Sequence, residues 1–196
     1  MSKSPPQHPA TIGFDFSHKT PAGDDKERLV CNGCGFINYV NPKIVVGAVT
    51  EWEGKILMCR RAIEPRKGFW TLPAGFMEEG ETTEQGAKRE AREEANADLE
   101  ILSLLAVYSI PRISQVQLMY KARLCSPNVS AGVESLEVAF FDWDEIPWNE
   151  IAFPSVVWAL NHYRQVRDMT LFAPFVNPEG ENGNFPVAGQ GLNRPD

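Results

Sequence analysis

The sequence has few cysteines and no long apolar run, and each of these shortages excludes a class of protein. Four cysteines among 196 residues cannot form the dense disulfide network of a small secreted scaffold. No apolar stretch approaches the roughly 20 residues that cross a bilayer. The first residues lack the apolar segment of a signal peptide and the arginines of a transit peptide. We therefore expect a cytoplasmic protein with no membrane partner.

Positive charge is also scarce. The 19 basic and 26 acidic side chains give a net charge of −7, which argues against a broad surface for nucleic acid. The length fits one domain with a sizeable core. Both chain ends are rich in proline, glycine and polar residues, so we expect a flexible arm over residues 1–28 and an extended tail over residues 169–196.

What the sequence does contain is a glycine-rich turn followed by a helix with clustered glutamates. At about 100° per residue, Glu90, Glu93 and Glu94 fall within an arc of about 100°. Like charges this close repel one another, and a divalent cation removes that cost. Carboxylate oxygens suit Mg²⁺ or Mn²⁺, and Mg²⁺ usually binds together with substrate phosphates. The spacing predicts a metal site, and the alternative is a surface helix with solvated charges.

Residues around this cluster favour a well-defined helix. Thr82 begins a capping-box pattern, and Asn96 tolerates the left-handed conformation that ends a helix. Arg89 precedes Glu93 by four residues and can reach back to Glu81, so it would hold the carboxylates in place. An adjacent stripe of small residues would let the helix pack closely on a sheet; it consists of Ala87, Ala91 and Ala95.

These residues match the Nudix box, G-x5-E-x7-R-E-U-x-E-E-x-G-U, where U is a bulky apolar residue. The matching positions are Gly75, Glu81, Arg89, Glu90, Glu93 and Glu94. Ala91 and Ala97 are small where bulk is usual, and Asn96 replaces the last glycine. The chain thus resembles the Nudix hydrolase family. This resemblance implies an α/β fold, in which a mixed sheet lies between helices as an α/β/α sandwich.

Apolar patterns on both sides of the box predict the remaining elements. Strands are expected at residues 43–50 and 55–59, joined by a tight turn as a hairpin. Further strands are expected at residues 100–108, 115–124 and 137–141, and a helix at residues 155–167. The Nudix domain should therefore cover residues 43–168.

The resemblance also implies a set of catalytic residues. The groups that would hold Mg²⁺ or Mn²⁺ are Glu90, Glu93, Glu94 and a backbone carbonyl near Ala74 or Gly75. Arg89 would orient these carboxylates. A box glutamate, or Glu134 or Glu137 on a later segment, would act as general base. Each of the latter two could instead be a solvated surface acid.

Other residues are candidates for binding the substrate. Arg60 and Arg61 lie between the hairpin and the box, where they could contact a pyrophosphate; solvated surface charge is the alternative. Gly75, the first residue of the Nudix box, is a further candidate. The rings of Trp70 and Tyr108 could stack on a purine or flavin, and core packing is the alternative for each.

The segment Cys31-Asn32-Gly33-Cys34-Gly35 has the pattern of half a zinc ribbon. Structural zinc normally needs four ligands, and the upstream sequence has no second cysteine pair. We therefore expect a knuckle-like segment over residues 29–42 without Zn²⁺, although Cys31 and Cys34 are possible ligands.

Several segments are similar to ribbon-bearing Nudix pyrophosphatases that act on FAD and ADP-ribose: residues 31–35, 41–43, 59–63, 70–76 and 132–137. We predict hydrolysis of the pyrophosphate bond of such a nucleotide, by a homodimer as is common in the family. Two alternatives stay open. One is a pyrophosphatase that removes damaged nucleoside triphosphates, and the other is a nucleotide-sensing module without catalysis.

Overall fold

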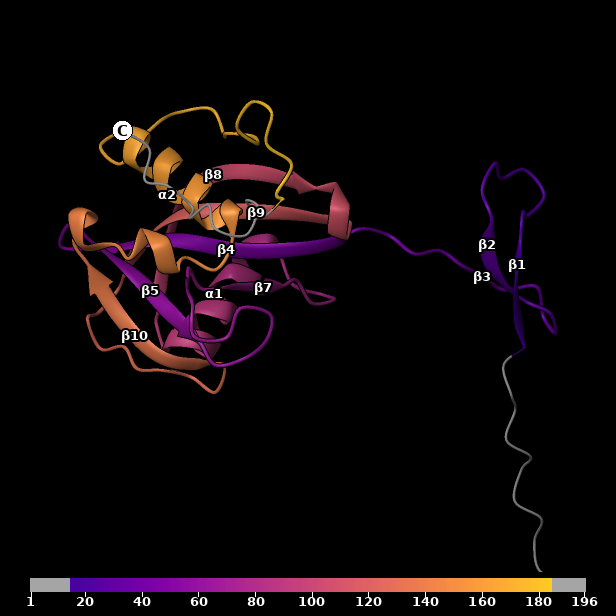
Figure 1. Ribbon diagram of the computed structural model, residues 1–196, viewed down its shortest axis with the longest axis horizontal. Helices are drawn as coiled ribbons and strands as arrows, with labels where there is room; N and C mark the ends of the chain where they lie inside the picture. Colours follow the sequence, from indigo (N-terminus) through magenta and orange to yellow (C-terminus); the bar gives the residue numbers. More distant parts are fainter. Residues whose placement is uncertain (1–14, 185–196) are drawn as a thin grey trace, which may run out of the picture. The chain divides into compact units, whose positions relative to one another are not determined.

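The computed structural model describes residues 15–184, and the chain divides after Asn41 into two compact units (Figure 1). The N-terminal unit is a three-stranded antiparallel sheet in the order β1-β2-β3. Its strands are β1 (Phe16–Lys19), β2 (Arg28–Cys31) and β3 (Ile37–Asn38). Strand β1 falls within residues 1–28, for which the sequence predicted an arm. The unit therefore begins upstream of the expected knuckle at residues 29–42, and residues 1–14 lie outside the described part.

The C-x-x-C-G segment forms the turn between β2 and β3. The backbone N–H of Gly35 donates to the carbonyl of Cys31 at 2.9 Å. Asn32 Oδ1 accepts hydrogen bonds from Ser17 Oγ at 2.8 Å and from Lys19 Nζ at 2.5 Å. Side-chain hydrogen bonds thus connect β1 to the cysteine-bearing turn.

The second unit contains a mixed sheet of 7 strands. They are β4 (Lys43–Trp52), β5 (Lys55–Arg61), β6 (Trp70–Thr71), β7 (Ala74–Phe76), β8 (Leu99–Ile110), β9 (Gln115–Leu124) and β10 (Ser135–Phe141). The main order is β10-β5-β4-β9-β8, while β6 pairs with β5 and β7 pairs with β4. Strands β4 and β9 are parallel, and the other pairs are antiparallel. The predicted strands are confirmed, with ends that differ by a few residues.

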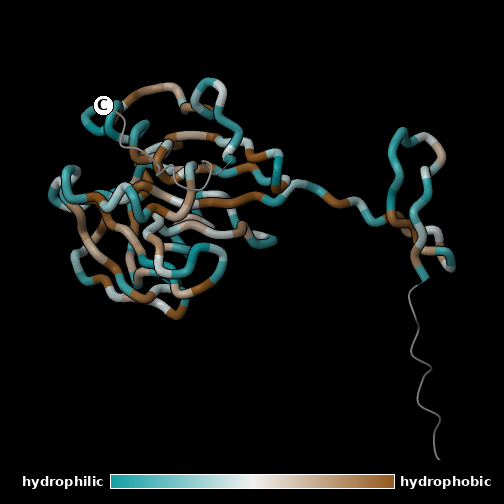
Figure 2. Tube along the Cα trace, in the orientation of Figure 1, coloured by the Kyte–Doolittle hydropathy of each residue, from teal (hydrophilic) through white to brown (hydrophobic). Residues whose placement is uncertain are grey.

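Two helices cover opposite faces of this sheet, α1 (Thr83–Ala95) and α2 (Pro154–Val166) (Figure 1). The predicted stripe on α1 is fully buried in one hydrophobic cluster: Ala87, Ala91 and Ala95. A separate cluster packs α2 on the other face, through residues such as Val157 and Leu160. Strand β4 is hydrophobic for much of its length because both layers cover it (Figure 2). The α/β/α sandwich is therefore confirmed.

Short 3₁₀ helices link the later elements, at Pro111–Ile113, Trp143–Glu145 and Trp148–Glu150. Residues 167–184 follow α2, and part of this stretch docks on strand β8. Phe175 forms a parallel bridge with Ala106, and Asn177 exchanges hydrogen bonds with the backbone of Ser109, both at 2.8 Å. Within residues 15–184, no helix is both long and apolar enough to cross a membrane.

The predicted hairpin opens soon after its turn, and this opening creates room for the site. Strands β4 and β5 pair at only two positions, both next to the turn. Farther along, β5 pairs with β6 and β4 pairs with β7. The short segment between β6 and β7 stays bonded to β4, because Ala48 N–H donates to Pro73 O at 3.3 Å. The first residues of the Nudix box therefore enter the middle of the sheet.

Candidate active site

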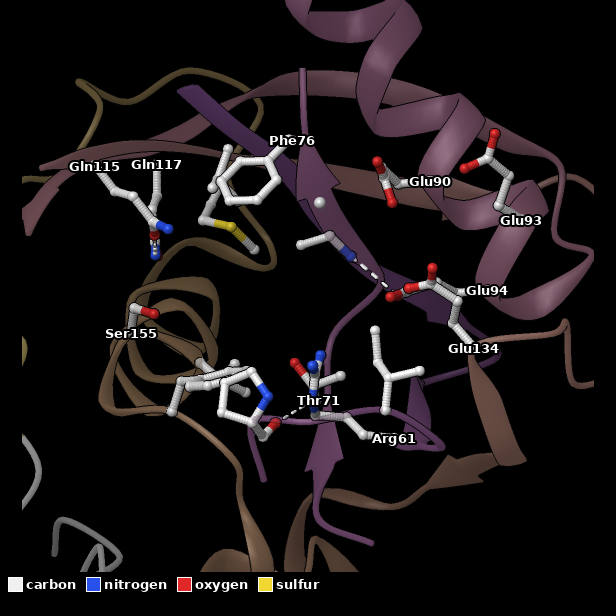
Figure 3. A pocket seen from close by; sticks show the side chains of 18 of the residues that line it. Arg61, Thr71, Phe76, Glu90, Glu93, Glu94, Gln115, Gln117, Glu134 and Ser155 are labelled. Carbon is white, nitrogen blue, oxygen red and sulfur yellow. Dashed lines mark hydrogen bonds between the residues drawn. The ribbon is translucent and has the colours of Figure 1, made fainter. Parts of the chain in front are cut away.

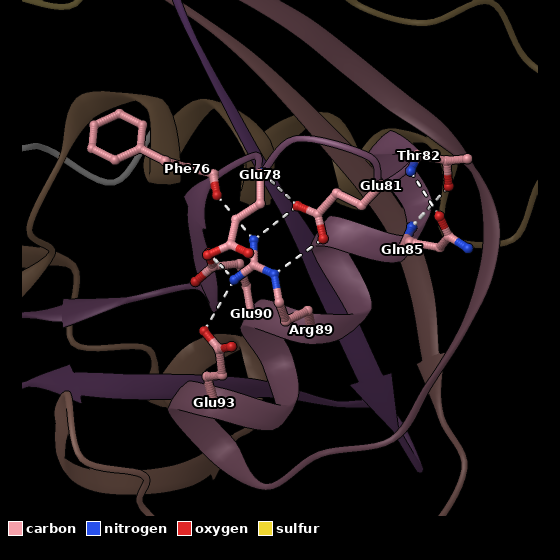
Figure 4. A network of polar contacts seen from close by, with 8 residues as sticks. All are labelled: Phe76, Glu78, Glu81, Thr82, Gln85, Arg89, Glu90 and Glu93. Carbon is pink, nitrogen blue, oxygen red and sulfur yellow. Dashed lines mark hydrogen bonds and ion pairs between the residues drawn. The ribbon is translucent and has the colours of Figure 1, made fainter.

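Helix α1 has the ends that its sequence predicts. Thr82 Oγ1 accepts from Gln85 N–H at 3.2 Å, and Gln85 Oε1 accepts from Thr82 N–H at 2.8 Å, which completes the capping box (Figure 4). Asn96 ends the helix with φ 48° in the left-handed region. These two ends fix the positions of the acidic residues between them.

Two glycines let neighbouring segments approach this helix closely. A Cβ on Gly75 would overlap the carboxylate of Glu90, so only glycine lets that side chain lie against strand β7. A Cβ on Gly132 would overlap the backbone carbonyl of Glu93. Gly132 N–H also donates to the carbonyl of Glu94 at 3.0 Å. The loop before β10 is therefore bonded to the C-terminal end of α1.

Arg89 is the centre of an ion-pair network (Figure 4). Its guanidinium donates to both carboxylate oxygens of Glu81 at 3.1 and 2.9 Å. Nη1 donates to Glu90 at 2.7 Å and to Glu93 at 3.0 Å, and Nη2 donates to Phe76 O at 2.9 Å. The hydrogen bond from Arg89 lowers the pKa of the Glu81 carboxyl. The predicted contacts of Arg89 with Glu81 and Glu93 are confirmed.

Glu94 is the most buried acid of the cluster, with 5% of the residue exposed. Burial raises the pKa of its carboxyl to about 8, and the nearby charge of Glu90 adds to this effect. A hydrogen bond from Ala74 N–H to Glu94 Oε2 at 3.1 Å acts in the opposite direction. Burial also raises the pKa of Glu90, and the charge of Glu134 contributes to the rise at both groups. Negative charge is thus costly here unless a cation joins it.

These groups line a cavity of about 1220 Å³ with three sectors (Figure 3). The acidic sector contains Glu90, Glu93, Glu94 and Glu134. A second sector contains Arg61 and Thr71, and a third contains Phe76, Gln115 and Gln117. Phe153, Ser155 and Met119 also line the cavity. The cavity exceeds the roughly 300–1,000 Å³ of ordinary small-molecule sites. It therefore has room for a ligand with an organic group on each side of a charged centre.

Most of the residues expected at the site line this cavity: Arg61, Ala74, Gly75, Arg89, Glu90, Glu93, Glu94 and Glu134. Arg60 and Glu137 do not. Successive strand residues point to opposite faces, so Arg60 and Arg61 diverge on β5. Arg60 Nε donates to Gly68 O at 2.8 Å, and Arg60 Nη1 lies 3.6 Å from Glu137 Oε2, its register partner on β10.

The two aromatic candidates for stacking on the substrate lie in the hydrophobic core instead. Trp70 is 6% exposed and packs edge-on against Phe141, with ring centroids 4.9 Å apart. Tyr108 is fully buried, and its hydroxyl bonds His162 Nδ1 at 2.7 Å. Both rings pack within the second hydrophobic cluster, so the structure places them away from the cavity.

Sequence reasoning missed the third sector. Phe76 directly follows the first glycine of the box, and Gln115 and Gln117 alternate with apolar residues at the start of their strand. This alternation was a usable signal, because polar residues two positions apart share one face of a strand. What the sequence lacked was the register in which β9 and β7 each pair with β4.

The donor set fits a divalent cation. Two buried carboxylates, Glu90 and Glu94, repel one another, and a cation between them would offset the cost that raises their pKa values. Glu93 is 57% exposed at its side chain and bonds Arg89. Across residues 15–184, no three His, Cys, Asp or Glu side chains converge in an arrangement that could hold a metal ion. Glu93 would therefore need to turn from Arg89 to join the other two.

The finding that no three such side chains converge within residues 15–184 includes the turn that carries the cysteines. Cys31 and Cys34 supply two thiols, whereas structural zinc normally takes four ligands. Backbone hydrogen bonds from Cys34 and Gly33 lower the pKa of the Cys31 thiol. The turn itself is formed by backbone and Asn32 hydrogen bonds.

Comparisons with known proteins identify the family. The NUDIX domain model matches residues 41–159, and the Nudix N-terminal zinc-ribbon model matches residues 13–40. The chain belongs to the Nudix hydrolase family. A crystal structure of a NUDIX hydrolase from Nitrosomonas europaea is similar, with 46% identity, a TM-score of 0.79, and coverage of 86% of this chain and 97% of that one.

Two curated relatives are named for their activities. An ADP-ribose pyrophosphatase from Methanocaldococcus jannaschii is 34% identical over 113 residues, which are 56% of this chain and 67% of the relative. The NAD-capped RNA hydrolase NudC from Haemophilus influenzae is 34% identical over 87 residues. That match spans 43% of this chain and only 33% of NudC.

Proposed function

We propose that the protein hydrolyses the pyrophosphate bond of a nucleoside diphosphate derivative, such as ADP-ribose or FAD, with Mg²⁺ or Mn²⁺ as cofactor. The observation that carries this proposal is a pair of buried carboxylates, Glu90 and Glu94, that line a cavity with two further sectors. The name of the archaeal relative, an ADP-ribose pyrophosphatase, supports the substrate class.

The carboxylates have separate tasks in this proposal. Glu90, Glu93 and Glu94 would hold the cation, which when bound would withdraw charge from the pyrophosphate oxygens. Arg89 holds Glu90 and Glu93 on one side of the acidic sector at 2.7 and 3.0 Å. It is a positioning residue, because its donors are occupied by protein oxygens.

Glu134 is the better placed of the two candidate bases outside the box. It lines the cavity, whereas Glu137 lies beside Arg60. Glu134 would accept the proton from the attacking water, while Arg61 would contact the diphosphate. The loop that carries Glu134 is held near α1 by the hydrogen bond from Gly132 to Glu94 O.

The shape of the cavity favours a diphosphate that joins two organic groups over a nucleoside triphosphate. The acidic sector has the Arg61 sector on one side and the Phe76 sector on another (Figure 3). A triphosphate would place an organic group in only one of them. ADP-ribose and FAD would occupy both.

Product analysis tests this function. Purified protein with Mg²⁺ would be offered ADP-ribose, FAD, NADH and 8-oxo-dGTP, and the products separated by chromatography. We expect two monophosphates from ADP-ribose or FAD. Glu94→Gln should lose at least about a hundredfold in kcat, as when a group that stabilises transition-state charge is removed. Glu137→Gln is the matched control, because that acid lies outside the cavity.

Three results would count against the proposal. No turnover of any compound would favour a nucleotide-sensing module, and faster release of pyrophosphate from 8-oxo-dGTP would favour triphosphate removal. Unchanged activity of Glu94→Gln would sink the assigned mechanism. The expected homodimer stays a separate prediction, which light scattering of the purified protein can test.

A further inference from the structure

Residues from three strands meet on one face of the sheet, beside the acidic sector. Val45 on β4 is the register partner of both Phe76 on β7 and Gln117 on β9. Residues opposite one another in a sheet point to the same face. Gln115 lies two positions before Gln117 and shares that face. Phe76, Gln115 and Gln117 all line the cavity, and Figure 3 shows them grouped.

Phe76 presents an exposed aromatic ring to this space. The residue is 49% exposed, although its neighbours on the sheet are half-buried. Lys43 Nζ lies 4.9 Å from its ring centroid, and the backbone carbonyl of Phe76 is bonded by Arg89. The ring is therefore fixed at its backbone, while part of its surface remains open to the cavity. A flat aromatic ligand would bury that surface by stacking.

The two glutamines supply a donor beside an acceptor. Gln117 Nε2 donates to Gln115 Oε1 at 3.2 Å. This bond leaves the amide N–H groups of Gln115 and the carbonyl oxygen of Gln117 for a ligand. Both residues are half-buried, so an unmet hydrogen-bonding group on a bound ligand would carry a cost. The edge of adenine presents an amino donor next to a ring-nitrogen acceptor, which matches this pair.

We propose that Phe76, Gln115 and Gln117 form the adenine subsite of this protein: Phe76 stacks on the base, and the two carboxamides read its amino edge. This subsite adds a binding site for the base to the proposed function. It rests on that function only for the position of the diphosphate. It assigns the adenosine half of the substrate to the Phe76 sector and leaves the other half to the Arg61 sector.

Equilibrium binding tests the subsite without requiring turnover. Calorimetry would measure the affinities of AMP, GMP, CMP and ribose 5-phosphate for the wild type, Gln117→Leu, Gln115→Leu and Phe76→Ala. The leucine variants keep the side-chain size, and Phe76→Ala keeps the carbonyl that Arg89 bonds. Gln165→Leu, at an exposed position on α2 outside the cavity, is the matched control.

We expect wild-type protein to bind AMP more tightly than GMP, CMP and ribose 5-phosphate. Each of the three cavity variants should weaken AMP binding about tenfold, the effect of one lost hydrogen bond or stacking contact. Their affinity for ribose 5-phosphate, and the affinities of Gln165→Leu, should stay at the wild-type values. For ADP-ribose, the loss should appear in KM more than in kcat.

The outcomes separate this subsite from the proposed hydrolysis. AMP binding no tighter than that of ribose 5-phosphate overturns the subsite, as do variants that keep the wild-type ratio of the two affinities. Hydrolysis of ADP-ribose together with either result leaves the function standing. Conversely, glutamine-dependent AMP binding without turnover supports the subsite and refutes the hydrolase. Gln115→Leu and Gln117→Leu give two independent readings should one of them fold poorly.

Discussion

Replacing Glu94 with glutamine should stabilise the metal-free protein, and the gain should increase with pH. Burial is the main reason that the pKa of the Glu94 carboxyl rises from 4.5 to about 8. Glutamine keeps the size of the side chain and an oxygen that can accept the hydrogen bond from Ala74. The substitution therefore removes chiefly the buried charge.

The direction in which the free energy of unfolding changes with pH depends on which state, folded or unfolded, binds the proton more tightly. Below pH 4.5 the carboxyl is protonated in both states, and the wild type carries no penalty. Between pH 4.5 and about 8 the unfolded chain releases the proton while folded Glu94 retains it, so the free energy of unfolding falls as pH rises. Above pH 8 the loss is complete. At 1.36 kcal/mol per pKa unit, the rise from 4.5 to about 8 amounts to roughly 5 kcal/mol.

Urea unfolding in the presence of a chelator, at pH 5, 7 and 9, measures this effect. Glu94→Gln should gain several kcal/mol over the wild type at pH 9 and little at pH 5. Glu93→Gln removes the same charge from a side chain that is 57% exposed, and its stability should stay within about 0.5 kcal/mol of the wild type at each pH. An advantage of Glu94→Gln that is equal at pH 5 and pH 9 would refute the reasoning.

Adding Mg²⁺ should narrow the difference in stability between Glu94→Gln and the wild type. A cation that binds only the folded state stabilises it by about 2.7 kcal/mol at a hundred times its Kd. The wild type should gain this amount, and Glu94→Gln, which lacks a ligand, should gain much less. Stability and activity would then change in opposite directions in this one variant.

Substitutions at three further positions test the scaffold around the acids. Arg89→Ala should lower the free energy of unfolding by about 3 kcal/mol in urea, because it leaves buried Glu90 without its partner; Arg89→Lys should restore stability more fully than kcat, since an ammonium cannot make the same fork of bonds. Gly132→Ala should cost about 2 kcal/mol and lower Tm in calorimetry, because its Cβ would overlap Glu93 O. Thr82→Ala should cost about 1 kcal/mol through loss of the helix cap, with kcat unchanged. Wild-type stability of any of the alanine variants would contradict the contact assigned to it.

Local patterns were sufficient to predict helix α1 and its acids. Capping residues, the stripe of alanines and the i, i+4 relation of Arg89 to Glu93 all act within one helix, so sequence spacing specifies them. The strand that contains Gln115 and Gln117 was predicted for the same reason. Patterns of this kind depend only on how often side chains return to the same face of a helix or strand.

Contacts between elements could not be predicted in the same way. The diverging directions of Arg60 and Arg61 depend on which face of β5 borders the cavity. Tyr108 and Trp70 were ambiguous, because an aromatic residue in a strand can face the core or a ligand. The Phe76 sector depends on the register of three strands, two of which are separated by about 40 residues.

The opening between β4 and β5 is the feature that joins the two faces of the sheet into one site. Helix α1 packs on one face, and the Phe76–Gln117 row lies on the other, so a continuous sheet would separate the carboxylates from the amides. Strand β7 lies in that opening and has only three residues. At Gly75 it carries no side chain, and the carboxylate of Glu90 occupies the space that a Cβ would fill. One short strand thus brings acids from one layer to the opening that borders the other, and any side chain at position 75 would displace the carboxylate of Glu90.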